Sequence, residues 1–201
     1  MAHLTRDALR SMGFAALGDP IWISNLASFH NCSNISIGHN VRIDDFCVLS
    51  AGTGGIEIGN FVHIAVHTSI IGAGRVEIRD FANLSSRVSV YSSSDDYSGV
   101  HMTNPTVPAE FTGVTSAPVI IDRHVIIGCG SVVLPGCTIN EGAAIGALSL
   151  VNCDCDQFSI YAGVPATRIK NRCKDLLIAE QNMRSLQARP SDSMRLFDIA
   201  P

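Results

Sequence analysis

The sequence lacks an excess of positive charge. Lys and Arg number 14 against 18 Asp and Glu, which gives a formal net charge of -4 at pH 7. A protein that binds the phosphate backbone of a nucleic acid needs clustered cations to neutralise it. We therefore expect no nucleic acid among the partners of this chain.

Long hydrophobic runs are also missing. The first residues carry charges at Arg6, Asp7 and Arg10 and contain no apolar stretch as long as that of a signal peptide. Nothing later in the chain approaches the length of a membrane span. We expect a cytoplasmic protein that does not enter a membrane.

The 7 cysteines lack the spacing of a disulfide or zinc framework. Their number is odd, and a chain of 201 residues is long enough to bury a core without cross-links. Cys153 and Cys155 are separated by a single residue, whereas structural zinc sites use two pairs with wider spacing. We expect reduced thiols and no bound metal.

What the sequence does contain is a repeat of six residues. Aliphatic side chains recur at this step through the second half, and a small or β-branched side chain stands four residues after the first five of them. The aliphatic series is Ile121, Ile127, Val133, Ile139, Ile145 and Val151, and the small series is Val125, Ser131, Cys137, Ala143 and Ser149. A helix repeats every 3.6 residues and a strand every two, so this period indicates a short strand and a turn, repeated.

The same pattern runs with interruptions through the first half. Ile37, Ile58 and Ile78 are equivalent positions, and each interval between them spans three hexads plus a few extra residues. The sequence therefore predicts an all-β coil with three short sides, in which the aliphatic residues point inward and the small residues occupy the corners. An apolar content of 46% and a mean hydropathy of +0.25 suffice for one such globular unit.

Four parts of the chain follow from where the repeat begins and ends. A short helix, begun by Thr5 and ended by Gly13, is expected to cover the open edge of the first coil. The predicted parts are an N-terminal cap at 1–20, the coil at 21–171, a C-terminal helix at 172–187 and a disordered tail at 188–201.

The hexad rhythm breaks over residues 91–119. A loop of this length inside a compact domain is usually functional. It contains a polar set that a simple connection would not need, including Asp95, Asp96 and His101. We interpret the loop as one wall of an active site.

Two segments resemble a known superfamily. Residues 126–151 (IIGCGSVVLPGCTINEGAAIGALSLV) and 161–172 (YAGVPATRIKNR) resemble the hexapeptide-repeat acyltransferases, which include galactoside, maltose and chloramphenicol acetyltransferases. The resemblance extends over about residues 20–172. It implies a left-handed parallel β-helix that forms a homotrimer and binds acyl-CoA, its co-substrate, between neighbouring subunits.

Residues 90–108 (VYSSSDDYSGVHMTNPTVP) resemble a narrower group of this superfamily. Its members acylate nucleotide-linked amino sugars for surface polysaccharides such as lipopolysaccharide O-antigen. By this resemblance we expect the amine of such a sugar to be the acceptor, with Ser85, Ser86, Tyr91 and Asp96 in contact with it.

The resemblance also implies a catalytic base in the loop. The superfamily places its general-base histidine in the loop that leaves the coil, and His101 is the matching position. Histidine suits this task near neutral pH. Asp95 is expected to hold the ammonium group of an amino sugar and to accept its proton. Which of Asp95, Asp96 and His101 acts as the base remains open.

The coenzyme A site is predicted near the end of the coil. In the superfamily the pantetheine arm runs along the coils, which places Cys129 and Ala147 beside it. The phosphates of coenzyme A need fixed cations, and Arg168, Lys170 and Arg172 supply them within a few residues. The same cluster also suits a solvated surface.

Three other functions are compatible with the sequence. The nearest is an O-acetyltransferase of a glycan or galactoside, with His101 deprotonating a hydroxyl. A zinc lyase of the carbonic-anhydrase type would use His63 and His67 with His101 or His124. The last is a β-helix that serves only in assembly.

Overall fold

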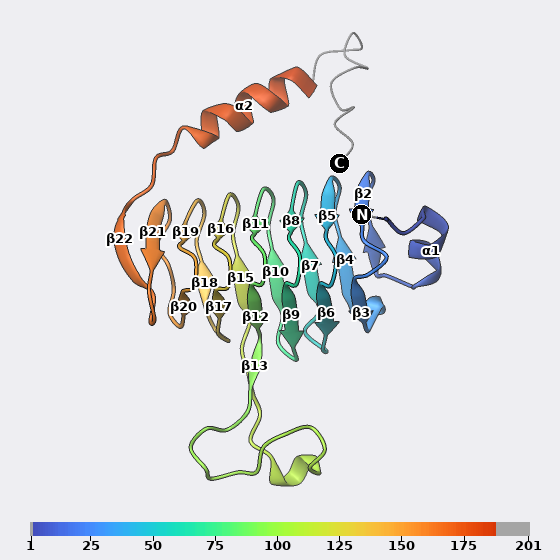
Figure 1. Ribbon diagram of the computed structural model, residues 1–201, viewed down its shortest axis with the longest axis vertical. Coiled ribbons are helices and arrows are strands. Elements are labelled where there is room, and N and C mark those ends of the chain that lie inside the picture. The colour runs from blue at the N-terminus through green and yellow to red at the C-terminus, as the bar shows by residue number, and fades with distance from the viewer. Residues whose placement is uncertain (1, 188–201) are drawn as a thin grey trace.

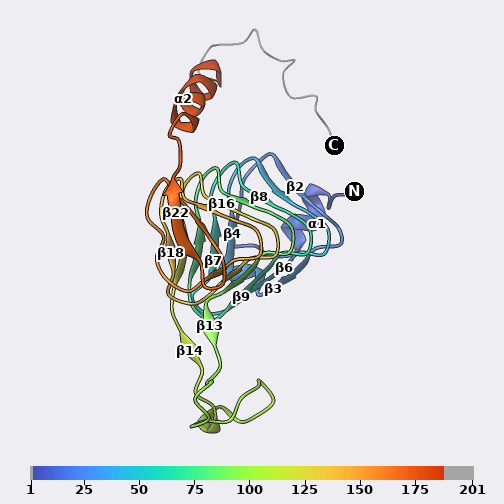
Figure 2. The ribbon, with the colours of Figure 1, turned by 60° about the vertical axis from the view of Figure 1, so that its left-hand side comes forward.

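The structure, a computed structural model, describes residues 2–187. The tail predicted to be disordered, residues 188–201, lies outside the described residues. Successive turns of chain stack along one axis as a left-handed parallel β-helix, and the coil is three-sided when viewed nearly along that axis (Figures 1 and 2). No helix in the described part is both long and apolar enough to cross a membrane.

Each side of the coil is a parallel sheet. Sheet 1 consists of β1 (Ala16–Leu17), β4 (Ile35–Ile37), β7 (Ile56–Ile58), β10 (Val76–Ile78), β15 (Val119–Ile121) and β18 (Thr138–Ile139). Sheet 2 consists of β2 (Ile21–Ile23), β5 (Val41–Ile43), β8 (His63–Ile64), β11 (Asn83–Leu84), β16 (Ile126–Ile127), β19 (Ala144–Ile145), β21 (Ser159–Ala162) and the antiparallel β22 (Thr167–Asn171). Sheet 3 consists of β3 (Ser28–His30), β6 (Val48–Ala51), β9 (Ser69–Gly72), β12 (Ser89–Tyr91), β17 (Val132–Val133) and β20 (Leu150–Val151).

The six-residue repeat produces this architecture as predicted. Ile121 pairs with Ile139 and Ile127 pairs with Ile145, so each residue lies beside the one three hexads later. Every member of the aliphatic series is buried, and so is every member of the small series. The core is therefore a stack of inward-facing aliphatic side chains along the axis. Each buried side chain of this kind stabilises the fold by roughly 1.5–3 kcal/mol.

The three corners are named by the sheets they join. The first corner joins sheet 1 to sheet 2, the second joins sheet 2 to sheet 3, and the third joins sheet 3 back to sheet 1. At the first two corners one residue in each coil after the first adopts a left-handed backbone conformation, as Phe81 does at the first and Arg87 at the second. This conformation reverses the chain tightly and turns a side chain outward.

The N-terminal helix, α1 (Arg6–Ser11), caps the first coil as expected. Thr5 accepts a hydrogen bond from the backbone N–H of Ala8, and Leu9 is buried in the core. The coil itself begins earlier than predicted, because β1 already pairs with β4 at Ala16 rather than starting after residue 20.

The other end of the coil differs from prediction in one respect. The C-terminal helix, α2 (Leu176–Gln187), begins at Leu176 and not at residue 172. Residues predicted to start the helix are preceded by β22, which folds back antiparallel on β21 and holds the chain extended. The helix then runs back over the coil (Figure 1).

The interruption at 91–119 forms an arm that projects away from the coil (Figure 2). Its stem is an antiparallel pair, β13 (Ser93–Ser94) with β14 (Thr115–Ser116), and its tip contains a short 3-10 helix, Ala109–Phe111. A second 3-10 turn, Cys32–Asn34, lies in the first coils. Ser92 anchors the base of the arm, because it is buried and donates a hydrogen bond to the carbonyl oxygen of Gly74 at 2.7 Å.

Candidate active site

The second corner brings four of the predicted site residues into one column. Ser85 and Ser86 follow β11, and in the next two coils the equivalent turns contain Cys129 and Ala147. Backbone hydrogen bonds hold the turns in register: Gly130 donates to the carbonyl oxygen of Ser86 at 3.0 Å, and the next coil's turn donates to that of Cys129 at 2.8 Å. The structure thus places these four residues along one edge of the coil.

Unused hydrogen-bond donors follow the same edge. Among the described residues, the backbone N–H groups of Ser86, Cys129 and Ala147 find no protein acceptor. Cys129 and Ala147 are exposed and small, so a ligand can approach their backbone. A row of free amides spaced by the coil repeat of about 4.8 Å suits the amide groups of a pantetheine arm.

The basic strand β22 adjoins the end of this edge. Arg168 and Lys170 are exposed on it. Arg168 donates hydrogen bonds to the side chains of Ser159 and Asn171, which hold its guanidinium near the surface. Their exposed positive charges make both residues candidates to bind a phosphate at the C-terminal end of the coil.

Arg172 has a different environment from the one predicted. Its Nη1 donates to three backbone carbonyl oxygens, those of His124 at 2.9 Å, Gly142 at 3.0 Å and Ala143 at 3.3 Å. Burial lowers the pKa of its guanidinium. The side chain therefore joins the end of β22 to the first corner, a structural task that the cluster of charges in the sequence did not reveal.

The loop residues lie on the arm, away from the second corner. Asp95 is exposed just beyond the stem. Asp96 accepts hydrogen bonds from the backbone N–H groups of Ser98 and His101, each at 2.8 Å, and lies 3.4 Å from Nδ1 of His101. Hydrogen bonds from Ser98 first, then from His101, hold the pKa of Asp96 far below its usual range.

The adjacent aspartates therefore have separate tasks. Asp96 is occupied in shaping the turn before His101, whereas the Asp95 side chain accepts no hydrogen bond from the described residues. Gly113 packs against the His101 ring so closely that a Cβ there would lie 2.6 Å from Nδ1. The arm thus fixes the backbone and the ring of His101, whereas the Asp95 carboxylate is left exposed.

Strand β12 separates the two groups of site residues within one chain. Ser85 precedes it at the second corner, and the arm leaves after it at the third corner. Tyr91 ends the strand, pairs with Ile71 and is half-buried. The predicted wall of the active site therefore does not face Ser85 of its own chain.

A groove on the coil lies away from these residues. It has a volume of about 710 Å³ and follows the outer face of sheet 1, where its polar residues include His39, Arg79 and Arg123. None of the residues predicted for the site lines it. We therefore build the site from the second corner and the arm.

The histidines considered for zinc have other contacts. His63 pairs with Asp44 at 2.9 Å, His67 stacks on Phe46, and His124 pairs with a glutamate of α2. Within residues 2–187, no group of three or more His, Cys, Asp and Glu side chains is arranged to hold a metal ion.

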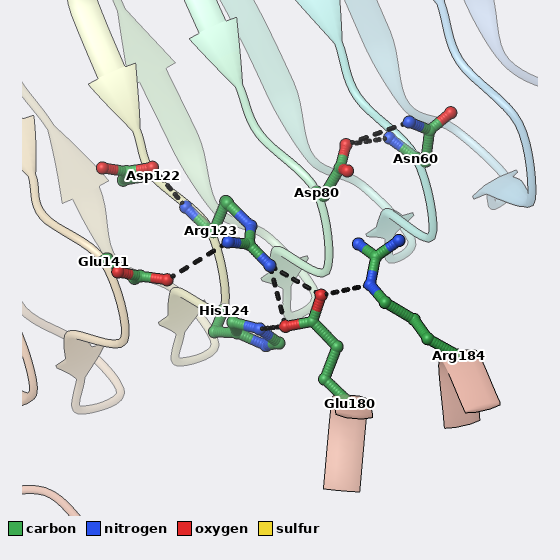
Figure 3. A network of polar contacts seen from close by, with 8 residues as sticks. All are labelled: Asn60, Asp80, Asp122, Arg123, His124, Glu141, Glu180 and Arg184. Atoms are coloured by element: carbon green, nitrogen blue, oxygen red, sulfur yellow. Dashed lines mark hydrogen bonds and ion pairs between the residues drawn. The ribbon is translucent and has the colours of Figure 1, made fainter. Parts of the chain in front are cut away.

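Sequence reasoning missed a polar network that attaches α2 to the first corner (Figure 3). Glu180 accepts hydrogen bonds from His124 Nε2 at 2.6 Å, from Arg123 Nη2 at 2.7 Å and from Arg184 Nε at 2.7 Å. Burial, the largest single influence, raises the Glu180 pKa, but the hydrogen bonds and charges around it prevail and lower it. One sequence feature could have indicated this docking site: aromatic residues such as Phe81 recur just before the small corner residues.

Comparison with known proteins agrees with this geometry. No family model matches the chain. It is 57% identical over 180 residues to a dTDP-4-amino-4,6-dideoxy-D-glucose acyltransferase of Escherichia coli, covering 90% of this chain and 94% of the relative. WbbJ of Escherichia coli K12, described as an O-acetyl transferase of lipopolysaccharide biosynthesis, is 31% identical, covering 84% and 86%.

A solved structure matches nearly the whole coil. AntD, an N-acyltransferase from Bacillus cereus crystallised with dTDP and coenzyme A, superimposes with a TM-score of 0.89 at 40% identity, covering 92% of this chain and 100% of that one. Other AntD structures hold dTDP-4-amino-4,6-dideoxyglucose with coenzyme A, or dTDP with 3-hydroxybutyryl-CoA. Several carry a substitution of a single aspartate or a single serine.

The fold and these likenesses define an acyl-CoA-dependent acyltransferase of the hexapeptide-repeat superfamily. Coenzyme A in its acylated form is the co-substrate. Within the superfamily, the chain belongs to the family of N-acyltransferases that act on nucleotide-linked amino sugars.

Proposed function

We propose that this chain transfers an acyl group to the amine of a dTDP-linked 4-amino-4,6-dideoxy sugar, in the cytoplasm, for a surface polysaccharide. Two of the relatives described above act on or bind this class of nucleotide sugar. The observation that carries the proposal is the column at the second corner, where free amides lead from Ser86 through Cys129 and Ala147 toward the basic strand. This column fits an extended thioester donor that ends beside Ser85.

A homotrimer completes the site in this proposal. Ser85 and Asp95 lie at opposite ends of β12 in one chain, so a second subunit must supply one of them. The arm projects away from the coil at the third corner (Figure 2), and in the proposed trimer it contacts the coil of a neighbouring subunit. A mass three times that of the chain, measured by light scattering, is expected; a monomer with full activity contradicts this assembly.

The chemistry then needs few groups. The sugar nitrogen attacks the thioester carbonyl carbon, the Ser85 hydroxyl donates a hydrogen bond to the developing oxyanion, and the C–S bond breaks to release the coenzyme A thiolate. The Asp95 carboxylate orients the ammonium group and accepts the proton that it must lose before attack. The nitrogen loses a second proton as the amide forms, the thiolate takes up one of the two protons and the other passes to solvent, so an ammonium and a thioester give an amide, a thiol and a proton.

Thiol release tests the proposal. The protein is incubated with acetyl-CoA or 3-hydroxybutyryl-CoA and a panel of dTDP-, UDP- and GDP-linked amino sugars. Turnover is expected with a dTDP-linked 4-amino sugar. Turnover of hydroxyl acceptors alone contradicts the proposal and favours O-transfer.

Substitution of His101 distinguishes transfer to an amine from transfer to a hydroxyl. A hydroxyl acceptor depends on a strong base, whereas an unprotonated amine is itself nucleophilic. His101→Ala should therefore slow N-transfer without abolishing it, and should abolish O-transfer. The position of His101 on the arm, held by Asp96, supports either role.

A further inference from the structure

A buried hydroxyl group contacts the turn that contains Ser85. Thr68 is completely buried, and its Oγ1 donates a hydrogen bond to the carbonyl oxygen of Ser85 at 3.2 Å. Thr68 directly precedes β9, so it reaches this turn from the neighbouring coil on the N-terminal side. The contact therefore lies on the inner side of the turn at which the proposed donor column ends.

Packing alone does not explain the Thr68 hydroxyl. One buried residue per coil occupies this place at the second corner, and in each case a strand N–H of one coil donates to the carbonyl oxygen of the corner residue in the next. These residues are Cys47, Thr68, Val88, Ser131 and Ser149. Valine has nearly the shape of threonine and fills the place in the coil of Ser85 itself. Because burying a hydroxyl costs free energy unless it is hydrogen-bonded, the contact with Ser85 is what the hydroxyl adds.

The Ser85 carbonyl group is held differently from its equivalent in the next coil. There the carbonyl oxygen of Gly128 accepts a hydrogen bond from the backbone N–H of Ser131, three residues later, at 3.3 Å. Among the described residues, the Ser85 carbonyl oxygen accepts no backbone hydrogen bond and has Thr68 as its donor. The orientation of this peptide group therefore depends on a side chain from another coil.

The same peptide group carries one of the unused donors of the column. The Ser85 carbonyl and the Ser86 N–H belong to one trans peptide, so they point in opposite directions. Thr68 holds the carbonyl toward the core and the N-terminal coils. The Ser86 N–H, which has no acceptor among the described residues, therefore points outward and toward the C-terminal coils, along the donor column.

A second buried hydroxyl repeats the arrangement farther along the column. Ser131 Oγ donates to the carbonyl oxygen of Gly146 at 2.9 Å, and Ser149 Oγ donates to the same oxygen at 2.7 Å. The N–H of that peptide group is the unused donor of Ala147. Buried hydroxyls at this corner thus fix peptide groups whose N–H groups face the proposed donor.

Resting on the proposed function, we propose that Thr68 is a positioning residue for acyl transfer. It fixes the peptide between Ser85 and Ser86, so that the Ser86 N–H and the Ser85 hydroxyl both face the thioester oxygen. Negative charge develops on this oxygen when the sugar nitrogen attacks the carbonyl carbon, and donors that are already aligned stabilise it without reorganising. Thr68 itself contacts neither substrate.

Steady-state kinetics of the full-length protein test this role, with acetyl-CoA and a dTDP-linked 4-amino-4,6-dideoxy sugar as substrates. Thr68→Val keeps the shape of the side chain and removes the hydroxyl. Its kcat is expected to fall about 10-fold or more while the KM for acetyl-CoA changes less than about 2-fold, because the alignment acts in the transition state. Thr68→Ser keeps the hydroxyl and should retain kcat within about 2-fold of the wild type.

A purely structural role would give the opposite order. Thr68→Val would then be the milder change, since serine leaves a space where the methyl group was. Cys47→Val is the matched control, because Cys47 occupies the same corner position one coil earlier and its Sγ contacts the carbonyl oxygen of Ala65 at 3.1 Å. This variant should retain the wild-type kcat. If Thr68→Val does not fold, Thr68→Cys replaces it and should have a lower kcat than Thr68→Ser, because a thiol is a weak donor.

Four results would overturn the assignment: an unchanged kcat in Thr68→Val, an equal loss in Thr68→Ser, a raised KM for acetyl-CoA with kcat unchanged, or an equal loss in Cys47→Val. If the wild type acylates the amino sugar in each of these cases, the proposed function stands. If it acylates hydroxyl acceptors alone, the proposed function fails, and the same comparison with that acceptor decides the role of Thr68, because the thioester oxygen gains charge with either nucleophile. If it acylates no acceptor, both proposals fail.

Discussion

Glu180 Oε2 lies 2.6 Å from His124 Nε2, and this contact joins the C-terminal helix to the coil (Figure 3). No residue of α2 is fully buried, so apolar packing contributes little to its docking. Glu180 is the shared acceptor for two positions of the coil and one of the helix. Among the described residues, every hydrogen bond and ion pair between α2 and the coil therefore ends on this one carboxylate.

Replacing Glu180 by Gln should release α2 without unfolding the coil. The amide keeps the shape of the side chain but removes the charge that the two guanidiniums bind. We expect faster deuterium exchange at the α2 amides and unchanged exchange in the strands. Unchanged protection of α2 would show that its apolar contacts suffice.

Acid should have the same effect on the wild type. The pKa of Glu180 is lowered from 4.5 in the docked helix, so its stabilising contribution is complete above pH 4.5. As the pH falls below this value the undocked form binds the proton first, and the contribution disappears once the pH passes the lower pKa of the docked form. Protection of α2, corrected for intrinsic exchange rates, should decline over this range. It should stay constant in Glu180→Gln.

The aliphatic series gives a prediction about stability. Ile127 is completely buried between Leu84 and Ile145 of the neighbouring coils. Ile127→Ala should lower the free energy of unfolding by about 2–5 kcal/mol, because it removes apolar contacts and leaves a cavity. Urea denaturation measures this. Ile126→Ala, at the adjacent half-exposed position, should cost clearly less, and an equal loss would contradict the assignment of inward and outward faces.

The two aspartates of the arm should respond differently to loss of charge. Asp95→Asn should reduce turnover roughly 100-fold or more, the contribution expected of a group that accepts a proton in catalysis. Asp96→Asn should loosen the turn before His101, which accelerates limited proteolysis of the arm and reduces turnover less. Equal turnover in the wild type and Asp95→Asn would remove Asp95 from the mechanism.

Removal of the two arginines near β22 should have different effects, one on the KM for acyl-CoA and the other on stability. Arg168→Ala should raise the KM for acyl-CoA and leave stability nearly unchanged, because the side chain is exposed. Arg172→Ala leaves carbonyl oxygens without their donor and should lower the free energy of unfolding by about 1–3 kcal/mol. Measuring both quantities in both variants distinguishes a phosphate contact from a structural one.

Much of the fold could be predicted from the sequence because each six-residue repeat forms one side of the coil. A residue such as Ile121 pairs with its equivalent three hexads later, so one periodicity specifies both burial and register. Handedness could not be derived in this way and came only from resemblance. The start of α2 was also misplaced, since the charges after Arg168 suit a helix and an exposed strand equally well.

The site was less accessible to sequence reasoning. Ser85, Cys129 and Ala147 could be placed on one edge because they occupy equivalent turns. The position of the arm could not be predicted, because the direction of the arm depends on where β12 ends and not on the residues of the arm. The carbonyl contacts of Arg172 could not be predicted for a different reason: a cation in a cluster does not reveal whether its partners are phosphates or backbone carbonyls.

The reversal of the chain at β22 also limits the length of the particle. A coil of parallel strands exposes an unpaired edge at each end, and such edges can add strands from another copy. Here α1 covers one end, and at the other β22 enters sheet 2 in the opposite direction. A further parallel coil added at this end would have to pair with β22, which runs opposite to the other strands of sheet 2. The sequence thereby sets the number of coils per molecule and opposes end-to-end growth into fibres.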